Sequence, residues 1–66
     1  MKIDERVKML RLQRHWSQQF VAGSIGIDQS SYSKYEQGKL DFSTGMVIKI
    51  AKLYDESADY LLGLKD

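Results

Sequence analysis

Apolar residues recur along this chain at intervals of three and four positions, which is typical of short amphipathic helices. The pattern predicts five such helices with no linker, repeat or low-complexity stretch between them. The first runs from about residue 3 to Arg14 and places Ile3, Val7 and Leu10 on one side. Arg11 lies on that same apolar side, an unusual place for a cation unless a buried acid faces it.

Two short helices follow, over about residues 18–24 and 29–37, and each has a cap residue before it and a glycine after it. Ser17 and Asp28 stand where a side-chain oxygen can accept from the unpaired amides of the first helical turn. Gly26 and Gly38 stand where glycine takes the left-handed conformation that ends a helix. Helices of this length are not stable alone, so they must pack on each other and on their neighbours.

Ser43 or Thr44 starts a fourth helix that reaches about Tyr54, and Ser57 starts a last short helix that Gly63 ends. With 66 residues, 42% of them hydrophobic, the chain makes one domain over residues 1–66. The predicted fold is all-α, a compact five-helix bundle around one core. The inner faces of its last two helices are expected to carry Val47, Ile50, Ala51, Tyr54, Tyr60 and Leu61.

Composition argues against several classes of function. The chain has no cysteine and one histidine, His15, so we expect no disulfide, no metal site and no cofactor. His15 and Ser17 are near neighbours in sequence, which does not make them partners in space, and we expect no enzyme. No apolar run reaches the length of a membrane span, and the charged N-terminus is unlike a signal peptide. The expected location is the cytoplasm.

Residues 18–37 form the most informative stretch, since two short helices joined by a glycine turn predict a helix-turn-helix. Ala22 lies where the two helices cross, and a larger side chain would push them apart. Three apolar residues are expected to lock the second of these helices in place, namely Ile25, Ile27 and Tyr32. The Tyr32 hydroxyl then needs a hydrogen-bond partner.

The opposite face of the helix over residues 29–37 is polar and poor in acids, with Gln29, Ser30, Ser33 and Lys34. Glutamine can bond adenine, serine can donate or accept, and lysine can reach guanine or a phosphate. Residues 1–39 contain seven Lys and Arg and four Asp and Glu, whereas residues 40–66 contain three and five. Double-stranded DNA is therefore the expected partner, with this recognition helix in the major groove.

The stretch WSQQFVAGSIGIDQSSYSKYEQGK, the segment IKIAKLY and the closing DYLLG resemble the Cro/CI-type (XRE-type, lambda-repressor-like) helix-turn-helix family. The resemblance covers about residues 3–63. It implies base reading by Gln18, Gln29, Ser30 and Lys34, with Ser31 and Ser33 at the margin. It further implies contacts to the DNA backbone by Ser17, Gln37 and Lys39, and a structural ion pair between Arg11 and Glu36.

This resemblance implies a transcriptional regulator, most simply a repressor, that binds two half-sites about one helical turn apart as a homodimer. A chain without a second domain would dimerise through its own body. The alternative is a protein-interaction module, such as an antitoxin-type partner, whose binding face would carry apolar anchors. Met46, Ile48, Leu62 and Leu64 are expected at the surface, either as a dimer contact or as ordinary exposed residues.

Overall fold

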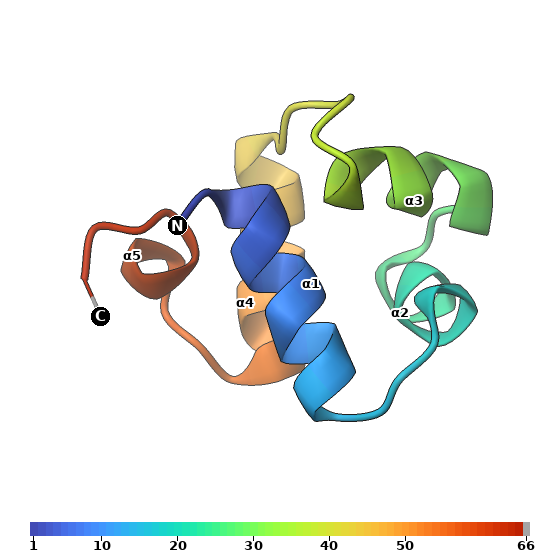
Figure 1. Cartoon of the computed structure of the whole chain (residues 1–66), viewed down its shortest axis with the longest axis horizontal. Coiled ribbons are helices and arrows are strands. Elements are labelled where there is room, and N and C mark those ends of the chain that lie inside the picture. Colours follow the sequence, from blue (N-terminus) through green and yellow to red (C-terminus); the bar gives the residue numbers. More distant parts are fainter. Residues whose placement is uncertain (66) are drawn as a thin grey trace.

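The computed structural model describes residues 1–65 and confirms an all-α fold (Figure 1). Asp66, the last residue of the expected domain, lies outside the described residues. The helices in chain order are α1 (Ile3–Gln13), α2 (Gln18–Ile25), α3 (Gln29–Glu36), α4 (Thr44–Tyr54) and α5 (Ala58–Leu61). All five predicted helices are present, with bounds within one or two residues of those expected.

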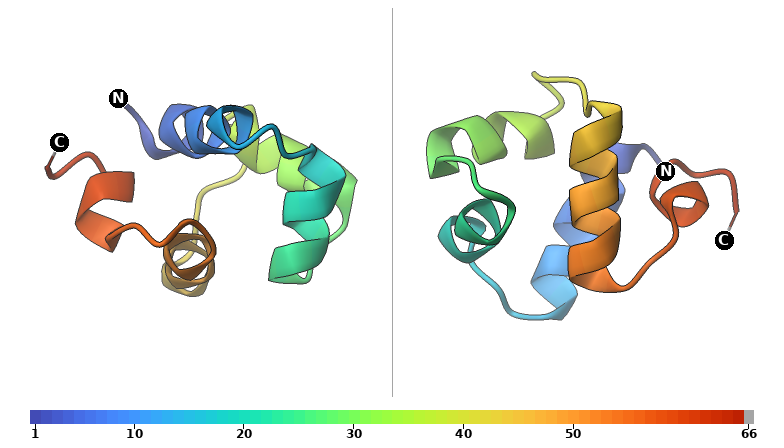
Figure 2. Two further views of the ribbon diagram at one scale, coloured as in Figure 1. Left: turned by 90° about the horizontal axis from the view of Figure 1, so that it is seen from below. Right: turned by 180° about the vertical axis from the view of Figure 1, so that it is seen from behind.

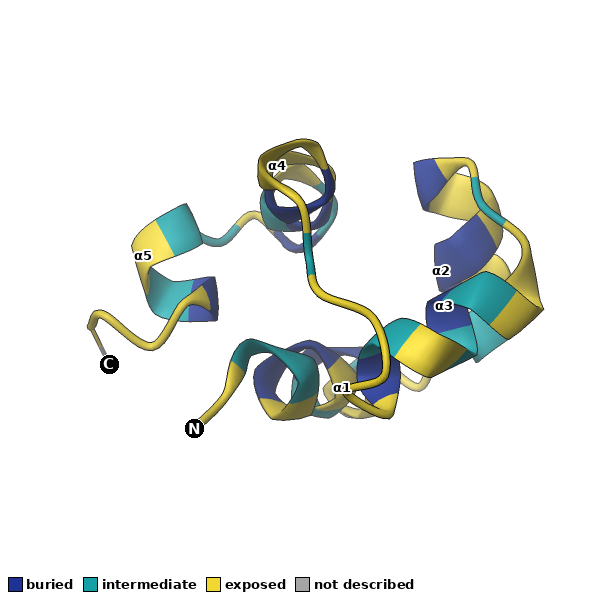
Figure 3. Cartoon of the chain, turned by 90° about the horizontal axis from the view of Figure 1, so that it is seen from above, coloured by how far each residue is buried: buried dark blue, intermediate teal, exposed yellow. Residues whose placement is uncertain are grey.

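The helices form a closed ring around one core. α1 packs on α3 and α5, α4 packs on α2 and α5, and α2 packs on α3. Figure 2 shows the same arrangement from two further sides, with α2 and α3 at one end of the molecule and α5 at the other. The buried faces of the helices turn toward the interior, as Figure 3 shows. The largest fully buried side chains are Tyr32, Tyr54, Ile50, Leu61, Val7 and Val21.

Serine caps start three of the helices as the sequence predicts. Ser17 Oγ accepts from the amide of Phe20 at 3.0 Å, and Ser43 Oγ accepts from the amide of Met46 at 3.1 Å. Ser43, rather than Thr44, is therefore the cap of α4. Ser57 does the same for α5. Each bond satisfies an amide that the helix itself leaves unpaired, which fixes where the helix begins.

α1 ends at Gln13, one residue earlier than expected, because His15 adopts a left-handed conformation with φ 57°. The amide of Trp16 then bonds the carbonyl of Arg11 at 3.2 Å, which closes the turn. The ring of Trp16 stacks on Tyr54 with centroids 5.5 Å apart and holds this turn against α4. The connection into α2 is therefore fixed from both sides.

Met46 corrects one expectation, since it is buried and only 8% exposed rather than part of a surface patch. It lies one helical turn before Ile50, so the two side chains share the inner face of α4. Arg6 is a second buried residue that the apolar pattern did not indicate. Its guanidinium donates to the carbonyl of Tyr60 at 2.9 Å and lies 4.2 Å from the centre of the Tyr60 ring, which joins α1 to α5.

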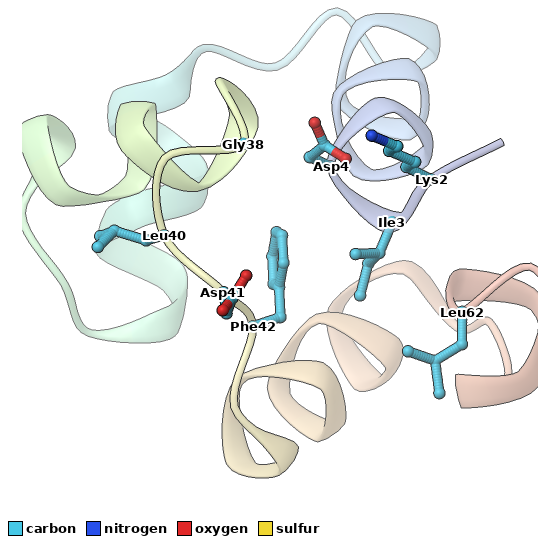
Figure 4. Close-up of a pocket in the computed structure, with 8 residues that line it drawn as sticks. All are labelled: Lys2, Ile3, Asp4, Gly38, Leu40, Asp41, Phe42 and Leu62. Atoms are coloured by element: carbon cyan, nitrogen blue, oxygen red, sulfur yellow. The ribbon is translucent and has the colours of Figure 1, made fainter.

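The connection from α3 to α4 passes close to the start of α1 and leaves a cavity of about 370 Å³ there (Figure 4). The ring of Phe42 stands between this connection and α1 and packs on Tyr35 with centroids 5.0 Å apart. Gly38 has φ 77°, and a β-carbon at this position would lie 3.0 Å from the carboxylate of Asp4. The glycine thus serves both the left-handed turn and the close approach of α1.

None of the helices in residues 1–65 combines the length and the apolar character that crossing a bilayer requires.

Candidate nucleic-acid interface

α2, the turn at Gly26 and α3 form the predicted helix-turn-helix. Gly26 has φ 80°, and the next amide, that of Ile27, bonds the carbonyl of Ala22 at 3.0 Å. Ala22 is 2% exposed where α2 packs on α3, so the small side chain sets how closely the two helices approach. Ile25 is buried and Ile27 is half-buried against the core. The two helices consequently form one rigid unit.

The inner face of α3 is held by Tyr32, which is fully buried among the core residues. Its hydroxyl, expected to need a partner, makes no hydrogen bond within residues 1–65, and neither does that of Tyr54. Burial and the nearby carboxylate of Glu36 raise the pKa of Tyr32 well above its ordinary value, so the side chain stays neutral. Tyr32 therefore positions α3 by packing rather than by hydrogen bonding.

Arg11 and Glu36 form the expected ion pair, which joins α1 to the end of α3. The Nε and Nη2 atoms of Arg11 donate to the two oxygens of Glu36 at 2.7 and 3.0 Å, and the side chains are 10% and 2% exposed. The Nη1 atom donates to the carbonyl of Trp16 at 2.9 Å. Gln18 also contributes, since its Nε2 atom donates to Glu36 Oε1 at 3.2 Å.

We call Arg11, Gln18 and Glu36 the clamp, because they come from α1, α2 and α3 and fix those helices together. Burial alone would raise the pKa of Glu36, but the hydrogen bonds from Arg11 and Gln18 and the positive charge of Arg11 outweigh it and lower this pKa. The hydrogen bond to Glu36 raises the pKa of Arg11. Arg11 and Glu36 thus both stay charged, as a buried ion pair with good geometry requires.

The outer face of α3 is open to solvent, and the structure brings most of the predicted base-reading residues together there. Gln29, Ser30 and Lys34 are exposed and Ser33 is half-buried on the same side. Ser31 does not join them, because one helical step of about 100° from Ser30 turns it toward the side of the half-buried Tyr35. Figure 3 shows this change between exposed and buried faces along α3.

Two side-chain hydrogen bonds lie on this outer face. Ser30 Oγ donates to Asp28 Oδ2 at 2.5 Å, and Gln37 Nε2 donates to Ser33 Oγ at 3.1 Å. Asp28 occupies the cap position with an extended backbone, but its side chain makes no cap bond to an amide, contrary to expectation. It bonds the Ser30 hydroxyl instead. Aspartate followed two residues later by serine is a local pattern that permits this bond and that the sequence already displays.

The residues expected at the DNA backbone flank this outer face. Ser17 precedes α2 and is exposed, and its cap bond leaves the amides of Gln18 and Gln19 pointing outward from the start of the helix. Gln37 ends α3. The amide of Lys39 bonds the carbonyl of Lys34 at 2.9 Å, which keeps Lys39 at the same end of α3. All three positions are exposed, one at the start of α2 and two at the end of α3.

The outer face of α3 has the chemistry of a nucleic-acid surface rather than of a protein contact. The large exposed hydrophobic residues of the described chain lie elsewhere: Met1, Leu12, Phe20, Leu40, Ile48, Leu62 and Leu64. Along residues 1–65 no three His, Asp or Glu side chains gather in a way that could hold a metal ion. The groups on the outer face of α3 that could contact a ligand are side-chain amides, hydroxyls and one amine.

Known proteins with similar sequences are transcriptional regulators of Bacillus subtilis (strain 168). The chain is 37% identical over 59 residues to the HTH-type transcriptional regulator AnsR, matching 89% of this chain and 51% of that protein. It is 33% identical over 63 residues to the HTH-type transcriptional regulator ImmR, matching 96% of this chain and 50% of that protein. The chain therefore spans about half the length of these curated relatives.

The fold is similar to that of the P22 c2 repressor protein, solved in complex with the synthetic operator 9T, with a TM-score of 0.85 over 94% of both chains. At 21% sequence identity this match concerns the fold alone. Residues 7–61 match the family described as helix-turn-helix. The chain belongs to this helix-turn-helix family of the Cro/CI type, which comprises DNA-binding transcription regulators and not enzymes.

Proposed function

We propose that this chain is the DNA-binding part of a transcriptional regulator and that α3 is its recognition helix. The observation that carries the proposal is the contrast between the two faces of α3. The inner face is fixed by Tyr32 and the clamp, whereas the outer face presents Gln29, Ser30 and Lys34 to solvent. A rigid helix with an exposed, acid-poor polar face suits the major groove, whose edges offer hydrogen-bond donors and acceptors.

The residues proposed to contact the bases lie on the outer face of α3 and at the start of α2. Gln29 suits adenine, whose N6 and N7 atoms match a glutamine amide, and Lys34 suits guanine O6 and N7 or a phosphate. Gln18 donates to Glu36 through its amide nitrogen, so its amide oxygen remains to accept from a base or from Gln29. Ser33 completes this set. Ser31 lies at its edge and plays the smaller part.

Phosphate binding falls to Ser17, Gln37 and Lys39. The start of α2 carries outward amides and the positive end of the helix dipole, which suits an anionic oxygen. Lys39 adds a cation near the end of α3. Contacts of this kind orient the protein on the duplex and carry little sequence information.

The regulator is proposed to act as a repressor and as a homodimer, working in the cytoplasm. The likeness in fold to a repressor bound to an operator supports the first point. Two copies would place their recognition helices in successive major grooves about 34 Å apart. Ile48, Leu62 and Leu64 are exposed apolar residues on or after the last two helices and are available for contact between copies. Met46 is buried and therefore does not belong to this contact surface.

Selection of bound sequences from a random duplex pool tests the proposed function. A shared motif in the selected DNA is the expected result, and a pool that stays random contradicts DNA reading. On the selected site, Gln29→Ala should lose about 1–3 kcal/mol of binding free energy, with little change on random DNA. An equal loss on both kinds of DNA would show that Gln29 does not read a base.

Lys39→Ala is the matching test of a phosphate contact. We expect weaker binding to selected and random DNA alike, and a plot of log affinity against log salt whose slope decreases by about one. Lys52→Ala, an exposed lysine near the end of α4, serves as the control for the lost charge. An unchanged slope for Lys39→Ala would remove Lys39 from the interface.

A further inference from the structure

The Ser30 hydroxyl is bound to a neighbouring carboxylate on the outer face of α3. Ser30 Oγ lies 2.5 Å from Asp28 Oδ2, and both residues are exposed. Since Asp28 makes no cap bond to an amide, its carboxylate is free to hold this hydroxyl. The bond is short and local, and no core residue takes part in it.

The direction of the proton in this bond follows from the charge on Asp28. The hydrogen bond from the Ser30 hydroxyl lowers the pKa of Asp28 below its ordinary value, so the group is a carboxylate at neutral pH. A carboxylate can only accept hydrogen bonds, whereas a serine hydroxyl has one proton and two lone pairs. The Ser30 hydroxyl therefore donates its one proton to Asp28, so it can only accept a hydrogen bond from a base or any other group.

We propose that Ser30 reads the operator as a hydrogen-bond acceptor only, so that the base it faces is one with an amino group in the major groove. Adenine N6 and cytosine N4 are the donors on that edge, whereas guanine O6 and thymine O4 are acceptors. Asp28 acts as a positioning residue, because it orients the hydroxyl without touching the base. This inference rests on the proposed function and adds which group of one base pair Ser30 contacts, the amino group rather than the carbonyl oxygen.

Ser33 offers the opposite case on the same helix. Its Oγ accepts from Gln37 Nε2 at 3.1 Å, so its own proton remains free to donate. Two serines that are equivalent by composition thus present opposite hydrogen-bonding character to a duplex. This difference in hydrogen-bonding character arises from the neighbouring side chains. Replacing Asp28 therefore removes it at Ser30 and leaves the serine in place.

The experiment compares the wild type with Ser30→Ala, Asp28→Ala and Asp59→Ala. Asp59 is an exposed acid in α5, on a helix that contacts neither α2 nor α3 appreciably, and controls for the loss of negative charge. Selection from a random pool with wild type and Ser30→Ala first locates the operator position whose preference depends on Ser30. Binding is then measured by fluorescence anisotropy on duplexes in which the preferred base pair at this position is intact, lacks its major-groove amino group or lacks its major-groove oxygen.

For the wild type and Asp59→Ala we expect removal of the amino group to weaken binding by about five- to tenfold, the lower end of the cost of a mismatched base pair, and removal of the oxygen to have little effect. For Asp28→Ala the loss on removal of the amino group should fall below about twofold, because the freed hydroxyl can turn its proton toward O6 or O4 of the paired base instead. Circular dichroism of Asp28→Ala, with the wild-type helix content expected, separates this effect from loss of α3.

Several results would overturn the inference. One is binding that depends on the carbonyl oxygen of the pair and not on its amino group, and another is a dependence on the amino group that Asp28→Ala leaves intact. A third is a motif in which Ser30→Ala changes no position. If Asp28→Ala abolishes a dependence on the amino group that Ser30→Ala retains, Asp28 reads the base itself and the inference is wrong. A pool that yields no motif with the wild type instead contradicts the proposed function, and the inference with it.

Discussion

Replacing Arg11 by methionine removes the cation of the clamp and leaves the Glu36 carboxylate with Gln18 as its remaining side-chain donor. An exposed ion pair is worth about 0–1 kcal/mol, but breaking a buried pair costs about 3–5 kcal/mol. The exposed fractions of 10% and 2%, with two hydrogen bonds of 2.7 and 3.0 Å, place this pair in the buried class. A chain of 66 residues has a free energy of unfolding of about 3–10 kcal/mol in total. The loss caused by Arg11→Met is a large share of this value, so a large fraction of the variant molecules should be unfolded.

Urea unfolding followed by circular dichroism measures this loss, and a double-mutant cycle isolates the pair. Arg11→Met combined with Glu36→Met should be more stable than Arg11→Met alone, because no buried charge is left without its partner. The coupling should be at least about 2 kcal/mol, in the upper range for residues in contact. Lys8→Met, an exposed cation of the same helix, should stay within about 0.5 kcal/mol. Simple additivity of the Arg11 and Glu36 variants would refute the account of the clamp.

Two further predictions concern pH and glycine. The folded state lowers the pKa of Glu36, so its contribution to stability is complete above the ordinary pKa of 4.5 and is lost as pH falls through the lower, folded value. Urea midpoints between pH 7 and pH 3 should therefore fall more steeply for the wild type than for the clamp double variant, and parallel curves would contradict this. Gly26→Ala should cost about 1–2 kcal/mol because φ is 80°, although nothing lies within 4 Å of the added β-carbon. Gly23→Ala, equally unobstructed inside α2, should stabilise by about 1 kcal/mol, and equal effects at both glycines would refute the backbone explanation.

The fold could be predicted from the sequence because each helix carries its own start and stop signals. Ser17, Ser43 and Ser57 cap three helices, and Gly26 and Gly38 have the positive φ that ends a helix. These signals act within four or five residues, so no knowledge of tertiary contacts is needed to find them. The helix-turn-helix and its exposed face followed from the same local pattern.

The remaining features depend on contacts between distant segments. Arg6 is buried because Tyr60, 54 residues later, supplies a carbonyl and a ring, which periodicity in α1 does not indicate. Met46 shares the inner face with Ile50, and only the packing of α4 on its neighbours shows how wide that face is. The Arg11–Glu36 pair was expected from a resemblance, but the bond from Gln18 to Glu36 becomes visible only once α2 and α3 are placed together.

The separation of the two faces of α3 has a consequence for how such a protein changes over evolutionary time. Gln29, Ser30 and Lys34 are exposed, whereas stability resides in Tyr32 and the clamp on the other side. Surface substitutions of this kind usually change stability by less than about 0.5 kcal/mol. Under the proposed role of these positions in base reading, new target sequences can be explored through them at almost no cost in folding stability. The same scaffold can accordingly give rise to regulators that recognise different operators and do not interfere with one another.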